Sequence, residues 1–99
     1  MNDKLVHNIK NRKAELEQRL QEAWQKAQTS KAQYDELTEL LNTDLPDDAK
    51  QEVERLRQSK LAENAIAVEK VRNLLARLQV HEELLAALGE VSDGGAERG

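Results

Sequence analysis

The stretch Asn42-Thr43-Asp44-Leu45-Pro46-Asp47-Asp48 decides the fold of this 99-residue chain. Pro46 is the only proline in the sequence, and all four glycines come at or after Gly89. A proline lacks the backbone N–H donor and pushes the residue before it, here Leu45, away from helical angles. The asparagine, threonine and aspartates around it are residues that cap helices. The stretch therefore predicts a turn, at which one helix ends and another begins.

The segments on both sides of this turn have the composition of helices. Neither Met1 to Leu45 nor Asp47 to Leu88 contains a glycine or another proline, and both are rich in strong helix formers such as Leu, Ala, Glu, Gln, Lys and Arg. Gly89 stands where a glycine commonly ends a helix. We expect one domain at 1–88, with helices over about residues 3–43 and 46–88 and a turn at 43–46, followed by a disordered tail at 89–99.

Apolar residues recur with the seven-residue spacing of a coiled-coil seam. In the first segment the seam positions are Val6, Ile9, Lys13, Leu16, Leu20, Ala23, Ala27, Ser30, Tyr34, Leu37 and Leu41. In the second segment they are Ala49, Val53 and Leu56 and then, after a phase change of about one residue, Leu61, Asn64, Val68, Val71, Leu75, Leu78 and Leu85. Asn64 is polar in this pattern, so it either fixes the register or reaches solvent from the edge of the seam.

Two helices of equal length joined by a short turn favour an all-α fold, an antiparallel two-helix hairpin that resembles a coiled coil. A turn centred near Asp44 and Leu45 places residue i opposite roughly residue 89 − i. Small residues then face one another in the middle of the hairpin. They are Ala23, Ala27 and Ser30 in the first helix, and Ser59, Ala62 and Ala65, together with Ile66, in the second. This coincidence predicts a close approach of the two backbones.

More apolar side chains flank the expected seam than one partner helix can cover. The candidate interface residues are Trp24, Leu40, Leu74, Leu75, Leu78, Leu85 and Leu88. Burying each such side chain is worth ~1.5–3 kcal/mol, so we expect a homo-oligomer (a dimer forming a four-helix bundle) or the capture of a partner's helix. The leading hypothesis is a non-catalytic protein–protein interaction module, a self-associating hairpin that acts as an assembly subunit or adaptor. The alternative is a small export-type chaperone that holds a partner's amphipathic helix.

Charge is unevenly distributed along a chain whose formal net charge is −4. The sequence between Lys31 and Lys50 has no basic residue and contains an acidic tip: Asp35, Glu36, Glu39, Asp44, Asp47 and Asp48. This tip is either a docking surface for a basic partner or a solvated turn whose acids offset the helix dipole.

Basic residues gather near the N-terminus, which raises a rival hypothesis of another class, a nucleic-acid-binding regulator. They are Lys4, Lys10, Arg12 and Lys13. The negative net charge and the lack of an aromatic residue among these basic ones argue against this hypothesis.

Other classes of function are disfavoured by what the sequence lacks. There is no cysteine, so disulfides and thiolate metal sites are excluded. His7 and His81 are interpreted as surface residues, because a metal site needs three or four converging ligands. The sequence contains no G-x-S-x-G, glycine-rich phosphate loop or H-E-x-x-H motif, so we expect no catalytic activity and no cofactor. The apolar runs are too short for a membrane span and no signal peptide is evident, so the expected location is cytoplasmic.

Overall fold

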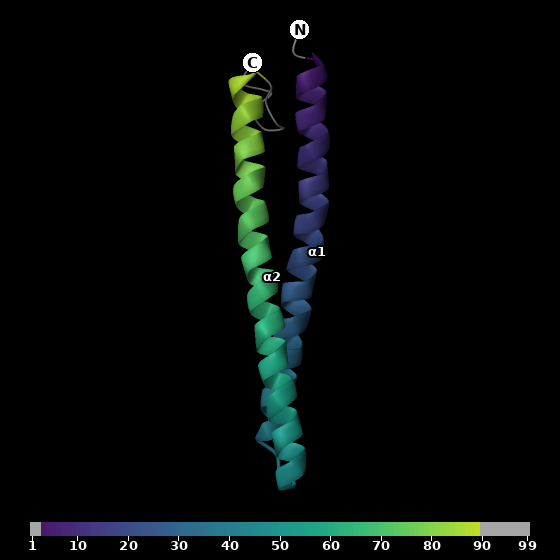
Figure 1. Cartoon of the computed structure of the whole chain (residues 1–99), viewed down its shortest axis with the longest axis vertical. Coiled ribbons are helices and arrows are strands. Elements are labelled where there is room, and N and C mark those ends of the chain that lie inside the picture. The colour runs from purple at the N-terminus through teal and green to yellow at the C-terminus, as the bar shows by residue number, and fades with distance from the viewer. Residues whose placement is uncertain (1–2, 90–99) are drawn as a thin grey trace. The chain divides into compact units, whose positions relative to one another are not determined.

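The computed structural model describes residues 3–89 as two antiparallel helices, which confirms the predicted all-α hairpin (Figure 1). Helix α1 spans Asp3–Leu41, and helix α2 spans Asp47–Ala87. Residues 42–46 connect them. The expected helices, at about 3–43 and 46–88, extend one or two residues further than these bounds at the turn. Of the expected tail, residues 90–99 lie outside the described residues.

Local hydrogen bonds account for the places where the helices end. The Thr43 hydroxyl folds back and donates to the Leu40 carbonyl at 2.6 Å. The Lys50 amide donates to the Pro46 carbonyl at 2.9 Å, which is an i→i−4 bond at the start of α2. Gly89 has a φ of 87°, a left-handed conformation that glycine adopts without steric cost after a helix. Pro46 and Gly89 therefore mark the beginning and the end of α2.

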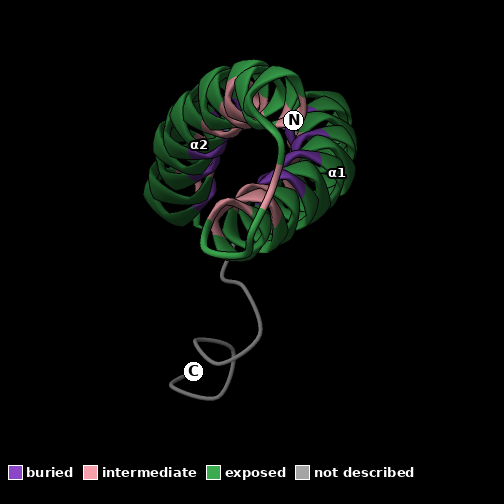
Figure 2. Ribbon diagram, turned by 90° about the horizontal axis from the view of Figure 1, so that it is seen from below, coloured by how far each residue is buried: buried purple, intermediate pink, exposed green. Residues whose placement is uncertain are grey.

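The chain divides into two compact units, which we describe separately. Unit 1 comprises Met1–Gln21 and Arg72–Gly99, and unit 2 comprises Glu22–Val71. In each unit, the buried residues lie on the sides of α1 and α2 that face each other (Figure 2). The buried apolar residues of unit 1 are Ile9, Leu16, Leu74, Leu78 and Leu85, and those of unit 2 are Ala23, Ala27, Ala67 and Val71.

The buried side of α1 is the one that the sequence predicts. All the expected seam positions, from Val6 to Leu41, are buried or half-buried, and Thr38 is the only additional half-buried residue of α1. The seam of α1 within unit 2 is made of small residues, because Ala23, Ala27 and Ser30 are all buried there. Regular 3–4 spacing of apolar residues was therefore sufficient to identify this side of the helix.

The seam of α2 differs from the expected one. Asn64, Val71, Leu78 and Leu85 are buried or half-buried as predicted. The expected alternate positions are wrong, because Leu56, Leu61, Val68 and Leu75 are 48%, 45%, 38% and 51% exposed. The observed seam keeps 3–4 spacing without a phase change and consists of Val53, Arg57, Lys60, Asn64, Ala67, Val71, Leu74, Leu78, His81, Leu85 and Leu88.

Polar side chains explain why the observed seam of α2 differs from the expected one. Arg57, Lys60 and His81 occupy seam positions, and the apolar residues next to Arg57 and Lys60 were expected there instead. The Lys60 side chain is 22% exposed and its Nζ lies 3.5 Å from Glu63. The Nδ1 of His81 donates to the Arg77 carbonyl at 2.9 Å. Long polar side chains bury their apolar stems while their polar ends remain satisfied. Apolar character alone was thus a poor guide to the phase of α2.

The side-chain contacts between the helices also differ from those that the expected register implies. Asn64 contacts Ala27 and Ser30, whereas the expected register places Ala62 opposite Ala27. All the α2 residues that were expected to face the small residues of α1 are exposed; they are Ser59, Ala62, Ala65 and Ile66. Side chains lean toward the N-terminus of their own helix, so in an antiparallel pair they meet partners further along the chain than the backbones suggest. The small residue of α2 that is buried in unit 2 is instead Ala67.

Candidate interaction surface

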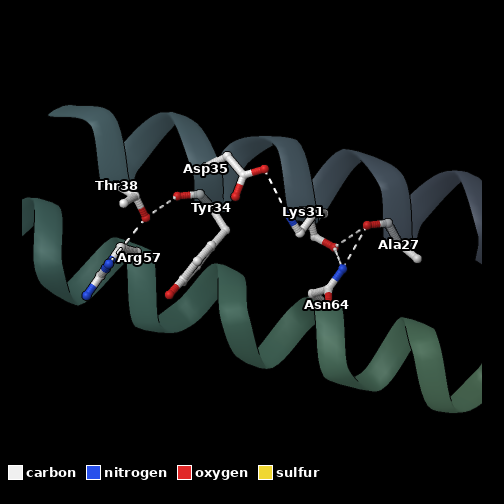
Figure 3. A network of polar contacts seen from close by, with 8 residues as sticks. Ala27, Lys31, Tyr34, Asp35, Thr38, Arg57 and Asn64 are labelled. Carbon is white, nitrogen blue, oxygen red and sulfur yellow. Dashed lines mark hydrogen bonds and ion pairs between the residues drawn. The ribbon is translucent and has the colours of Figure 1, made fainter. Parts of the chain in front are cut away.

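A polar contact occupies the seam of unit 2 and joins its two helices. The Asn64 Nδ2 donates to the Ala27 carbonyl at 2.8 Å and to the Ser30 Oγ at 3.2 Å (Figure 3). Ser30 is 2% exposed, and its hydroxyl donates to the Lys26 carbonyl at 2.9 Å. A polar seam residue with its partners in place specifies one register over its neighbours. The contact therefore answers the question left open for Asn64: it is a cross-helix bond within the hairpin.

A second polar cluster of unit 2 is centred on Arg57. Its Nη1 donates to the Thr38 Oγ1 at 3.2 Å, and its guanidinium carbon lies 5.3 Å from the centroid of the Tyr34 ring (Figure 3). Its Nη2 donates to Glu54 at 3.2 Å. Hydrogen bonds from Gln58 and then from Arg57 lower the pKa of the Glu54 carboxyl. The contacts of Arg57 with Thr38 and Tyr34 join α2 to α1, so this cluster has a structural role in the hairpin.

Three exposed apolar residues of unit 2 share one edge of the helix pair, which we call the Trp24 edge: Trp24, Leu61 and Val68. Each follows a seam residue directly, at Ala23, Lys60 and Ala67, and in an antiparallel pair such positions flank the seam on the same side. The hydrogen bond from Asn64 to Ala27 shows which residues lie at the same height along the helix pair. Val68 is one turn after Asn64 and Trp24 is about one turn before Ala27, so these two residues lie at similar heights. Trp24 is 53% exposed, Leu61 45% and Val68 38%.

Sequence reasoning named Trp24 as a candidate interface residue. It placed Leu61 and Val68 in the buried seam, so it did not predict their exposure. The signal that would have found them is the 3–4 spacing that runs without interruption from Val53 to Leu88 once polar seam residues are admitted. In that spacing, Leu61 and Val68 fall beside the seam and widen the apolar stripe, as expected of a helix that packs in a bundle.

The leucines expected to form an interface in unit 1 divide into two groups. Leu74, Leu78 and Leu85 are 4%, 8% and 7% exposed and form the core between α1 and α2. Leu88 is half-buried, and Leu75 is 51% exposed. Leu75 lines an open depression of α2 together with Leu78, Gln79, Glu82, Glu83 and Ala86. The hairpin core thus already uses most of this leucine set, and a partner contact at Leu75 stays a prediction.

The acidic tip lies in unit 2 and contains the turn. Asp47 and Asp48 are in the first turn of α2, where negative charge interacts favourably with the helix dipole. The Asp48 carboxylate also accepts a hydrogen bond from the Ala49 amide at 2.9 Å. Asp35 pairs with Lys31 at 2.8 Å. Glu36, Glu39 and Asp44 are exposed, and Leu40 beside them is 38% exposed. Asp47 and Asp48 therefore stabilise the N-terminus of α2.

The two histidines of unit 1 each contact their own helix. The Asn11 Nδ2 lies 3.3 Å from the His7 Nε2, and the His81 Nδ1 donates to the Arg77 carbonyl. Within residues 3–89, no three His, Asp or Glu side chains converge in a way that would hold a metal ion. In the same described part of the chain, neither helix has an apolar stretch long enough to cross a membrane.

Comparison with known proteins yields no relative from which a role could be transferred. No protein-family model, curated protein or solved structure matches this chain. Any functional assignment therefore rests on the surfaces described above.

Proposed function

We propose that this chain is a non-catalytic protein–protein interaction module that associates with a second copy of itself through the Trp24 edge. The observation that carries the proposal is the exposure of Trp24, Leu61 and Val68 on one edge of unit 2, beside seam residues that are buried or half-buried. Tryptophan is among the residues most enriched at the energetic centres of interfaces. Burying the exposed part of each side chain is worth roughly 1 kcal/mol or more.

The surroundings of the Trp24 edge favour a second copy as the occupant. A two-fold interface brings each residue close to copies of the same patch, so a charged patch would repel itself. The exposed residues one turn outward from the edge include Gln28 and Ala65, which carry no charge. Lys31 follows the seam residue Ser30 on the same edge, and its charge is paired with Asp35 at 2.8 Å. Two copies can therefore approach each other here with little like-charge repulsion, and their four helices would form a bundle. The acidic tip, by contrast, would repel a second acidic tip.

Sedimentation equilibrium of the wild type and Val68→Glu tests the proposal. We expect the wild-type chain to sediment as a dimer and Val68→Glu to sediment as a monomer, because a buried unpaired carboxylate is costly at an interface. The matched control is Ala32→Glu, which adds the same charge at an exposed position of α1 in the same unit and should remain a dimer. Circular dichroism should show equal helix content in all three.

A monomeric wild type, or a Val68→Glu chain of unchanged mass, would contradict self-association through this edge. A monomer that instead binds an added amphipathic helix at Trp24 would favour the adaptor and chaperone alternatives, in which another protein covers the same edge.

A further inference from the structure

A hollow on unit 1 brings together three arginines from both helices. It has a volume of about 380 Å³ and is lined by Arg12, Glu15, Leu16, Arg19, Arg77 and His81. Arg12 and Arg19 are seven residues apart, which places both on the same side of α1. Arg77 approaches from α2, four residues before the seam residue His81. Three arginines therefore line one opening, although they come from distant parts of the sequence.

These three arginines have no carboxylate partner within residues 3–89, unlike several other cations of the chain. Lys13 pairs with Glu82 at 3.8 Å, and Arg55 pairs with Glu52 at 2.7 Å. Glu15 lines the hollow but makes no ion pair with any of the three arginines. The hollow therefore has an excess of positive charge, which is three arginines against one glutamate, in a protein whose net charge is negative.

The donors of the hollow suit a phosphate group. An arginine presents a planar fork of N–H donors that matches two oxygens of a phosphate. A phosphate monoester carries close to two negative charges at neutral pH, which equals the excess positive charge of the lining residues. The His81 Nδ1 donates to the Arg77 carbonyl, and this hydrogen bond orients the ring.

We propose that this hollow binds a phosphate dianion, carried either by a small molecule or by a phosphorylated side chain of a protein. A nucleic acid fits less well, because its phosphodiesters carry one charge each and the lining residues include no Phe, Tyr or Trp on which a base would stack. The proposal involves none of the residues of the Trp24 edge and does not depend on self-association.

Calorimetric titration of the full chain tests the proposal with four ligands: inorganic phosphate, a phosphoserine peptide, the same peptide without phosphate, and a single-stranded oligonucleotide. We expect inorganic phosphate and the phosphopeptide to bind and the unphosphorylated peptide not to bind. Tighter binding of the phosphopeptide than of inorganic phosphate identifies a protein source, and equal binding identifies a small molecule. No binding of either phosphate ligand, or tighter binding of the oligonucleotide, overturns the proposal.

Two variants of the hollow and one control locate the binding. Arg19→Gln and Arg77→Gln each remove a charged donor and should weaken phosphate binding about tenfold or more. Arg72→Gln is the matched control, because Arg72 is an exposed arginine of α2 in the same unit and does not line the hollow. Its affinity should stay within about twofold of the wild type. An equal loss in Arg72→Gln would show unspecific screening and would overturn the assignment to the hollow.

Discussion

Replacing Leu74 with alanine is expected to lower the free energy of unfolding by about 2–5 kcal/mol, because the truncation leaves a cavity that the surrounding helices fill only in part. Leu74 is 4% exposed, which places it among the most deeply buried side chains of unit 1. Its neighbour Leu75 is 51% exposed, so Leu75→Ala should lower the free energy of unfolding by less than about 1 kcal/mol. Urea denaturation followed by circular dichroism measures both values.

The comparison of these two variants is made in a Val68→Glu background, so that self-association contributes nothing to either free energy. The two substitutions remove the same atoms from adjacent residues, and therefore their difference reports burial alone. Equal losses, or a larger loss at Leu75, would mean that the seam of α2 runs through Leu75 and that the phase described for this helix is wrong.

Replacing Ala27 with leucine is expected to lower the free energy of unfolding by about 1–3 kcal/mol, because the larger side chain overpacks a closely spaced seam. Ala27 is 8% exposed, and its carbonyl accepts a 2.8 Å hydrogen bond from Asn64 of the other helix. Any separation of the helices at Ala27 would also weaken that bond. Thermal unfolding of the variant should show a lower Tm than the wild type.

Ala32→Leu is the control for this substitution, because Ala32 is an exposed residue of the same helix and unit. It adds the same side-chain volume without entering the seam, and it should change the Tm little. If Ala27→Leu were as stable as Ala32→Leu, the close approach of the helices in unit 2 would be refuted.

The sequence predicted the buried side of α1 and the position of the turn for physical reasons that are local. Apolar and small residues repeat in α1 with regular spacing. Pro46 cannot continue the first helix because it has no backbone N–H for the next helical hydrogen bond. The phase of α2 depends instead on how individual polar side chains are satisfied. Lys60 and His81 take seam positions because their polar atoms find Glu63 and the Arg77 carbonyl, and spacing alone does not reveal such contacts.

The candidate surfaces were less predictable, since they depend on the phase of α2 and on the register between the helices. A phase shifted by one residue places Val68 and Leu61 in the interior and makes Leu74 a candidate for the surface. The arginine hollow requires the register as well, because Arg77 meets Arg12 and Arg19 only after the two helices are paired. To predict these surfaces, one needs to know which residues of α1 and α2 contact each other, and the sequence pattern alone does not show this.

The fluorescence of Trp24 tests the central claim, self-association through the Trp24 edge, most directly, because Trp24 is the only tryptophan in the sequence. Emission and acrylamide quenching are recorded for the wild type and for Val68→Glu over a series of dilutions. The account predicts that the concentrated wild type emits at shorter wavelength and is quenched less than Val68→Glu, since the indole is buried against the second copy. On dilution, both values should converge on those of the variant. Identical spectra and quenching for the two proteins at every concentration would contradict the account.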